Sequence, residues 1–152
     1  MTELSTSVRP KRPEFRNLNA FKDLPSYRWP LASLVSGMHR VSGLILFLMM
    51  PFLIWMFDTS VSSELSFARF THVFLVGFEI ARGLRVPGLL VKLVALGLIW
   101  AYLHHFMAGM RHIRMDIFHT VSKEQGKKTA VLTLFFSLSL TALFGAKLFG
   151  VF

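Results

Sequence analysis

The stretch "AYLHHFMAGMRHIRMD", residues 101–116, places three histidines, two arginines and an aspartate at the end of a long apolar run. The run begins near Gly88, so the whole segment is long enough to cross a bilayer as a helix. Ionisable side chains are costly inside a membrane and almost always face the interior of a helix bundle or a water-filled cavity. The stretch therefore predicts a membrane-spanning helix whose polar side chains form part of a functional site inside a helix bundle.

The composition agrees with a membrane protein. The chain has 152 residues, of which 53% are hydrophobic and only 16% charged, with 16 Phe and 8 Met. A soluble single domain could not hide so much apolar surface. Cysteine is absent, which excludes a disulfide framework, a zinc ribbon and an iron–sulfur cluster ligated by this chain. The net charge of +9 comes mainly from Lys and Arg that flank the apolar runs, a distribution that fits membrane topology rather than nucleic-acid binding.

The sequence divides into a basic tail and a membrane domain. Residues 1–28 are polar, contain six Lys or Arg and lack an apolar signal-peptide core, so we expect a cytoplasmic tail. Residues 29–152 form the membrane domain, with predicted spans at about 29–57, 88–113 and 129–148. Residues 65–85 mix aromatic, β-branched and charged side chains and predict an amphipathic helix on the outer surface. The expected fold is an all-α membrane protein with three transmembrane helices.

Counting Lys and Arg gives the orientation. The tail carries six, the connection between spans two and three carries five, and the connection between spans one and two carries three. Because cytoplasmic segments are richer in these residues, we expect the N-terminus in the cytoplasm and Phe152 outside. No Ser-rich, acid-free transit segment is present, which favours a bacterial inner membrane over a mitochondrial one.

The first two spans carry matching polar stripes. With 100° of rotation per residue, the second span aligns two histidines with a glycine and an aspartate: His105, Gly109, His112 and Asp116. His104 points about 100° away from them. The first span aligns a second polar set: Ser36, His39, Arg40 and Gly43. Arg40 and His105 lie at similar depths, roughly 15 Å and 13 Å from the same side, so the two stripes are expected to face each other.

Arg40 needs an anionic partner from outside the chain. An arginine within lipid costs at least ~2.5 kcal/mol on insertion scales, and no acidic residue of the chain lies near this depth. A haem propionate or a carboxylate of another subunit would supply the charge. Gly43 and Gly109 would leave room for a flat cofactor, and a neutral imidazole at His105 is a suitable axial iron ligand.

Each of these features also has a plainer interpretation. An intramembrane histidine is often a hydrogen-bonded contact between helices, and glycines in spans are usually packing notches. Arg111, His112 and Arg114 would then simply mark the membrane interface. Spacing alone leaves these alternatives open.

Two motifs carry a resemblance to a known family. "RWPLASLVSGMHRVSG" (28–43) and "HHFMAGMRHIRMD" (104–116) resemble the cytochrome b subunit of succinate dehydrogenase, the larger membrane anchor of respiratory complex II. The first family pattern, Ser-x-x-His-Arg-x-x-Gly, is met by Ser36, His39, Arg40 and Gly43. The second, His-x-x-x-Gly-x-Arg-His-x-x-x-Asp, is met by His105, Gly109, Arg111, His112 and Asp116. The resemblance extends from about Arg9 to the C-terminus.

The resemblance implies roles for these residues. His105 would be one axial ligand of a b-type haem, and a second, smaller anchor subunit would supply the other histidine. His39 and Arg40 would lie near the haem propionates, and Ser36 with Arg40 would help form the ubiquinone site beside the iron–sulfur subunit. Three residues would support propionates, quinone-linked water or subunit docking: Arg111, His112 and Asp116.

The resemblance also implies a division of labour. A flavoprotein subunit oxidises succinate, an iron–sulfur subunit carries the electrons, and this chain anchors the assembly and houses quinone reduction without catalysing succinate oxidation itself. The tail and the lysines of residues 123–128 would meet the iron–sulfur subunit or anionic lipid. Two alternatives are the anchor of a fumarate reductase, and a non-enzymatic membrane scaffold or small transporter, which would show no haem absorption.

Overall fold

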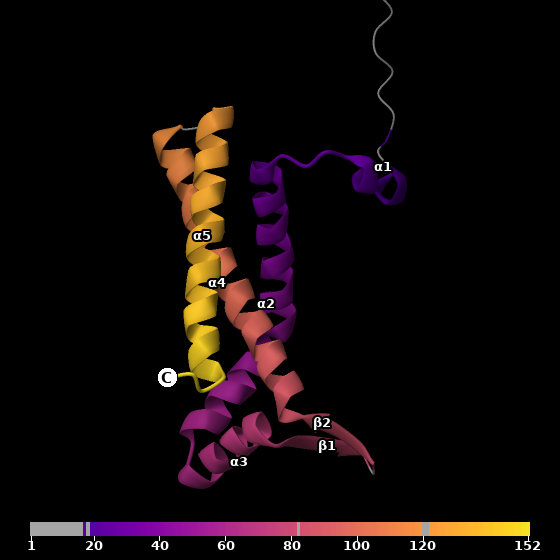
Figure 1. Cartoon of the computed structure of the whole chain (residues 1–152), viewed down its shortest axis with the longest axis vertical. Helices are drawn as coiled ribbons and strands as arrows, with labels where there is room; N and C mark the ends of the chain where they lie inside the picture. The colour runs from indigo at the N-terminus through magenta and orange to yellow at the C-terminus, as the bar shows by residue number, and fades with distance from the viewer. Residues whose placement is uncertain (1–16, 18, 82, 120–121) are drawn as a thin grey trace, which may run out of the picture.

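The computed structural model describes residues 17, 19–81, 83–119 and 122–152. Three long helices dominate it, and they pack along one another: α2 (Leu31–Val61), α4 (Gly88–Phe118) and α5 (Lys123–Leu148) (Figure 1). All three are long and apolar enough to cross a membrane. The prediction of an all-α membrane protein with three transmembrane helices is therefore confirmed, with one short hairpin as the only strand structure in the described chain.

The helices extend beyond the spans predicted for them, α2 and α4 at their C-terminal ends and α5 at its N-terminal end. Helix α2 begins at Leu31 rather than at Trp29, because Pro30 is its N-cap residue in an extended conformation. Helix α5 begins at Lys123, because the Ser122 side chain accepts the backbone N–H of Gln125. Hydropathy marks the stretch that lies in lipid, whereas caps and hydrogen bonds decide where each helix ends.

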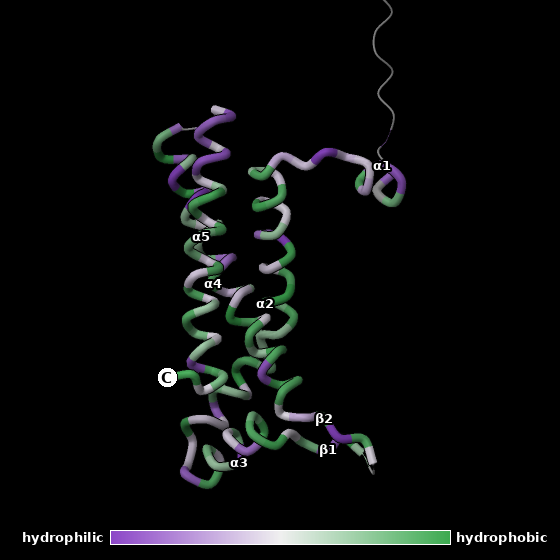
Figure 2. The backbone as a smooth tube through the Cα atoms, viewed as in Figure 1, coloured by the Kyte–Doolittle hydropathy of each residue, from purple (hydrophilic) through white to green (hydrophobic). Residues whose placement is uncertain are grey.

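Small residues form the centre of the bundle. Val35 of α2, Ala108 of α4 and Ala130 of α5 are completely buried and form one cluster. Small side chains allow helix backbones to approach closely, and within lipid this close packing drives association. Many large apolar side chains of the three long helices stay exposed, and these helices are coloured mostly hydrophobic along their length, apart from hydrophilic stretches at the α4–α5 end (Figure 2). This distribution suits a bundle surrounded by acyl chains.

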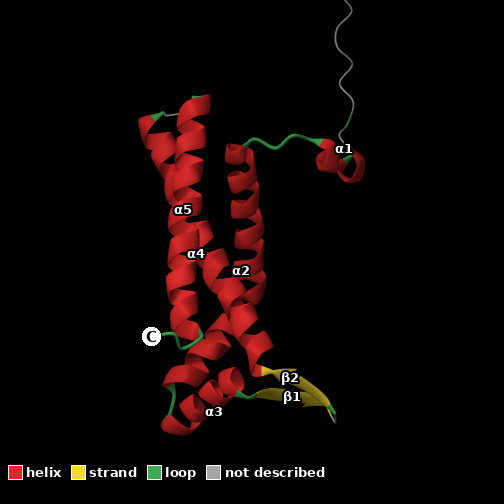
Figure 3. Cartoon of the chain, viewed as in Figure 1, coloured by secondary structure: helices red, strands yellow, loops and turns green. Residues whose placement is uncertain are grey.

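The connection between the first two spans differs from the predicted amphipathic helix over 65–85. Helix α3 (Glu64–Leu75) is followed by an antiparallel hairpin of β1 (Gly77–Ala81) and β2 (Leu84–Pro87), coloured yellow in Figure 3. The helix prediction is correct up to residue 75 and wrong beyond it. Gly77 breaks the helix with a φ of +100°, and a Cβ atom there would overlap the Val86 carbonyl oxygen, so only glycine fits.

The elements gather at two ends of the bundle. Helix α1 (Ala20–Ser26) and the junction of α4 with α5 lie at one end, while α3, the hairpin and the C-terminus lie at the other (Figure 1). Three spans place the start of α2 at Leu31 and the C-terminus at opposite ends of the bundle (Figure 1). Of the predicted tail over 1–28, residues 17 and 19–28 are described and include α1, and the rest lies outside the described residues. Which end faces the cytoplasm stays a prediction.

Candidate functional site

Two histidines and two glycines form reciprocal contacts between α2 and α4. His105 of α4 lies over Gly43 of α2, where an added Cβ atom would come within 2.7 Å of the His105 Cε1 atom. His39 of α2 lies over Gly109 of α4, where an added Cβ would be 3.7 Å from His39 Nε2. The space above these glycines, which the sequence suggested for a flat cofactor, is therefore filled by imidazole rings of the facing helix.

Three imidazoles lie together along this contact. The rings of His39 and His105 stack with centroids 4.2 Å apart and an interplanar angle of 21°. The His39 ring also lies 5.2 Å from that of His112, at 39°. His105 and His112 thus share one face of α4 and turn it towards α2, as their spacing predicts.

The environment of His105 fixes its orientation and its proton. Its Nδ1 atom lies 3.1 Å from the His39 carbonyl oxygen and 3.4 Å from the Ser42 hydroxyl. Because a carbonyl oxygen only accepts, Nδ1 of a neutral ring carries the proton, and the Nε2 lone pair has no hydrogen-bond partner among the described residues. Metal-binding histidines are commonly held in this way, by a carbonyl on the nitrogen that does not bind the metal. The side chain would therefore fit a ligand of haem iron.

Ser42 is the residue of this site that the sequence reading missed. It is completely buried, and its hydroxyl also donates to the His39 carbonyl at 2.9 Å. Ser42 thus touches both the backbone that holds His105 and the His105 ring itself. Its position three residues after His39, next to Gly43, was the signal available in the sequence.

Ser36 and Arg40 lie one turn apart on α2. Ser36 is half-buried and Arg40 is exposed. Within the described part of the chain, neither side chain takes part in a hydrogen bond, and the Arg40 guanidinium forms no ion pair. Their polar groups are therefore free to meet a molecule or subunit at this face of α2.

Arg111 faces the other neighbour of α4. Its side chain is buried, with Nε donating to the Thr129 hydroxyl at 3.0 Å and Nη2 to the Gly126 carbonyl at 3.4 Å, both on α5. The structure therefore separates Arg111 from His112 and places it outside the histidine contact. Asp116 is exposed near the C-terminal end of α4.

His104 also points away from the histidine contact. Its ring stacks on Trp100 at 5.3 Å and 22°, it is completely buried, and neither ring nitrogen has a hydrogen-bond partner among the described residues. The adjacent histidines therefore face different surroundings, as the rotation of about 100° per residue predicts.

The fold and site define a multi-pass helical membrane protein with a histidine site between its first two spans. Residues 9–144 match the family described as "Succinate dehydrogenase/Fumarate reductase transmembrane subunit". The chain belongs to this family, as the two sequence motifs predicted.

Two relatives narrow the comparison. The chain is 30% identical over 108 residues to a succinate dehydrogenase cytochrome b556 subunit from Coxiella burnetii, covering 71% of this chain and 78% of the relative. It is 28% identical over 120 residues to a protein of the same name from Paracoccus denitrificans, covering 79% and 83%. These relatives are subunits of succinate dehydrogenase and, by name, cytochromes b.

Proposed function

We propose that this chain is the larger membrane anchor of a bacterial succinate:ubiquinone oxidoreductase, where it binds b-type haem together with a second, smaller anchor subunit and forms part of the ubiquinone-reduction site. A flavoprotein and an iron–sulfur subunit would oxidise succinate and deliver the electrons. The observation that carries the proposal is His105, whose Nδ1 is fixed on the His39 carbonyl while Nε2 stays available.

His105 would hold the haem iron from α4. Haem supplies one-electron redox chemistry when bound. The Gly43 notch, the His39 carbonyl and the Ser42 hydroxyl fix the His105 ring from α2, and the backbone acceptor on Nδ1–H orients the ring for binding through Nε2. His39 and Arg40 follow each other on α2 and would serve the propionate side, where the guanidinium offsets negative charge.

Ser36 and Arg40 would serve the quinone. The Ser36 hydroxyl can donate one hydrogen bond to a quinone carbonyl, and Arg40 adds a fixed positive charge near the oxygen that gains electrons. His112, whose ring packs against that of His39, and Asp116 would support this region at the membrane interface. Arg111 would support it indirectly, by holding α5 against α4.

The test compares the adjacent histidines. In complex purified from its native membrane, His105→Leu is expected to remove or alter the low-spin haem signal in the reduced-minus-oxidised spectrum. His104→Leu is the matched control, because it removes the same side chain from the adjacent position, where neither ring nitrogen has a hydrogen-bond partner among the described residues. A wild-type spectrum in the His105 variant would overturn the ligand assignment. Co-purification of two soluble subunits and a second anchor tests the partners in the same sample.

The anchor of a fumarate reductase is the second candidate, because the matching family includes such subunits. It would use the same fold and run the reaction towards fumarate with menaquinol. Rates with succinate and ubiquinone, compared with fumarate and menaquinol, distinguish the two. Faster fumarate reduction would favour the second candidate.

A further inference from the structure

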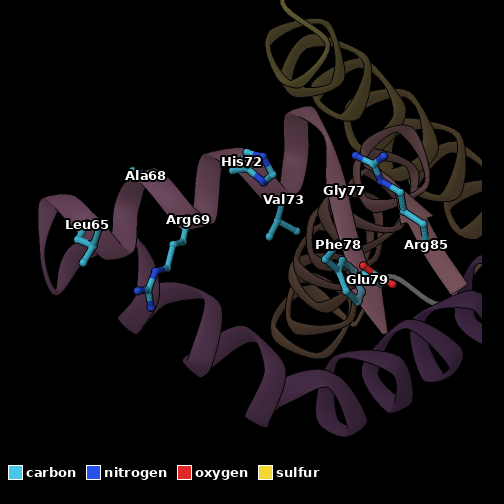
Figure 4. A pocket seen from close by; sticks show the side chains of 9 residues that line it. All are labelled: Leu65, Ala68, Arg69, His72, Val73, Gly77, Phe78, Glu79 and Arg85. Atoms are coloured by element: carbon cyan, nitrogen blue, oxygen red, sulfur yellow. The ribbon is translucent and has the colours of Figure 1, made fainter. Parts of the chain in front are cut away.

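A cavity lined by two arginines lies at the end of the bundle opposite α1, whereas the histidine site lies towards the end that carries α1 (Figure 1). It has a volume of about 640 Å³ and lies between α3 and the hairpin (Figure 4). Helix α3 contributes Arg69 and His72, and strand β2 contributes Arg85. Leu65, Val73 and Phe78 add apolar walls. The cavity therefore combines cationic and apolar side chains in one concave surface.

The two guanidinium groups of this cavity are available to a ligand. Arg69 and Arg85 are exposed, and among the described residues neither guanidinium forms a hydrogen bond or an ion pair. Glu79, the carboxylate in the lining, accepts the backbone N–H of Gly83 at 3.2 Å and keeps its negative charge opposite Arg85 in the register of the hairpin. The lining thus carries two guanidinium groups against one carboxylate, which leaves a net positive charge.

The position of the cavity specifies the environment of that ligand. Helix α2 ends at Val61 and α4 begins at Gly88, so α3 and the hairpin are held where two spans leave the bilayer. Leu65, Ile80 and Leu84 keep more than half of their surface exposed, which fits contact with acyl chains at a membrane interface. The predicted orientation makes this end the outer one, where arginine is less expected because cytoplasmic segments collect the positive charge. An anion bound in the cavity would offset the charge of these arginines.

We propose that the cavity between α3 and the hairpin binds the phosphate headgroup of an anionic phospholipid from the adjoining leaflet. Arg69 and Arg85 stand on two sides of the cavity (Figure 4) and attract the phosphate by their charge, and the exposed apolar side chains of α3 and the hairpin contact the acyl chains. The volume is within the range of small-molecule sites and admits a headgroup with the start of its chains. The proposal is independent of haem and quinone binding.

The experiment uses the whole complex and photoactivatable phosphatidylglycerol carrying a diazirine near the headgroup. Peptide mass spectrometry should locate adducts within residues 64–87 of the wild-type chain. The double variant Arg69→Gln/Arg85→Gln should lower this labelling by about tenfold, because two arginines near an anionic surface each contribute several-fold to lipid binding. Arg69→Lys/Arg85→Lys should retain most of the labelling and shows that loss in the Gln variant is not misfolding.

Three controls separate the sources of the signal. Lys127→Gln/Lys128→Gln removes the same charge at the other end of the bundle and should leave labelling of residues 64–87 unchanged. The matching phosphatidylcholine probe should label wild type and the Gln variant equally and weakly. Equal labelling by both lipids would overturn headgroup recognition, and suppression by millimolar inorganic phosphate would assign the site to a soluble anion. Absence of labelling in the wild-type complex would mean that another protein covers the cavity, which also overturns the proposal.

Discussion

At the scale of single residues, the α2–α4 contact depends on two glycines with different tolerances. The ring of His105 lies within 2.7 Å of the place where a Cβ of residue 43 would stand, whereas His39 leaves 3.7 Å at residue 109. The first distance is a clash with the stiff ring of the proposed iron ligand, and the second is ordinary van der Waals contact. A methyl group at residue 109 would thus be tolerated as ordinary packing, whereas a methyl group at residue 43 would displace the proposed iron ligand.

Gly43→Ala is expected to shift the His105 ring and to weaken its Nδ1 contact with the His39 carbonyl. The reduced-minus-oxidised spectrum of the purified complex should then change in position or intensity. Gly109→Ala is the matched control and should keep the wild-type spectrum. Identical spectra for both variants and wild type would mean that the ring position at Gly43 has no bearing on haem.

Ser36→Ala and Arg40→Leu test the quinone assignment. Each should leave assembly intact and lower succinate–quinone reductase activity. The expected loss is about tenfold to a thousandfold, because the lost group acts mainly on the reduced quinone. Arg40→Leu should be at least as damaging as Ser36→Ala and should also disturb the haem spectrum if the propionate contact is real. Succinate oxidation with a soluble artificial acceptor should survive, since that route bypasses the membrane. Wild-type ubiquinone reduction in both variants would contradict the assignment.

At the scale of elements, α5 packs through a stripe of small residues, of which the buried members are Gly126, Thr129, Ala130, Thr133, Ser137 and Gly145. The stripe brings α5 close enough to α4 for Arg111 to reach Thr129 and the Gly126 carbonyl. The hydrophobic effect is weak between helices in lipid. The α4–α5 contact is therefore stabilised by close backbone packing and by the hydrogen bond from the Arg111 guanidinium to the Gly126 carbonyl oxygen.

Ala130→Leu should weaken the three-helix contact, because residue 130 is completely buried against Val35 and Ala108. Overpacking of this kind typically costs about 1–3 kcal/mol, so the thermal midpoint of the complex in detergent should fall. Val131→Leu adds one methylene at the neighbouring exposed position and should leave the midpoint unchanged. Equal midpoints for the two variants would show that α5 packs differently.

At the scale of the whole molecule, the two ends of the bundle are built from different elements. One end carries α1, the α4–α5 junction and the lysines that begin α5, and the other carries α3, the hairpin and the C-terminus (Figure 1). The histidine site lies towards the first end, within the first part of α2 and the later part of α4. Partners that deliver electrons are therefore expected at the first end, and the proposed lipid contacts lie at the second.

The absence of cysteine allows a direct test of the topology. Ser62→Cys, between α2 and α3, should react with a membrane-impermeant maleimide in intact cells, whereas Lys123→Cys, at the start of α5, should react only after lysis. A C-terminal alkaline phosphatase fusion should be active, because its folding requires the periplasm. Labelling of residue 123 in intact cells, or a fusion at Phe152 that works only in the cytoplasm, would reverse the predicted orientation.

The residues differ in how far the sequence alone could place them. Rotation along the helix correctly separates His104 from His105 and correctly aligns His105 with His112. It does not distinguish the roles of Arg111 and His112, which are adjacent in one motif and contact different helices. Local periodicity gives the direction of a side chain about its own axis, but the partner in that direction depends on which helix packs there.

The sequence by itself determined the three spans, their order and the two polar stripes, because apolar length and a period of 3.6 residues are local properties of the chain. Only the tertiary structure decided that imidazoles fill the glycine notches, that Ser42 and the His39 carbonyl fix the proton of His105, and that residues 77–87 form a hairpin. The contacts across the notches join residues more than sixty positions apart, and the hairpin depends on pairing between strands. Packing and hydrogen bonding in three dimensions select such contacts, and no single segment encodes them alone.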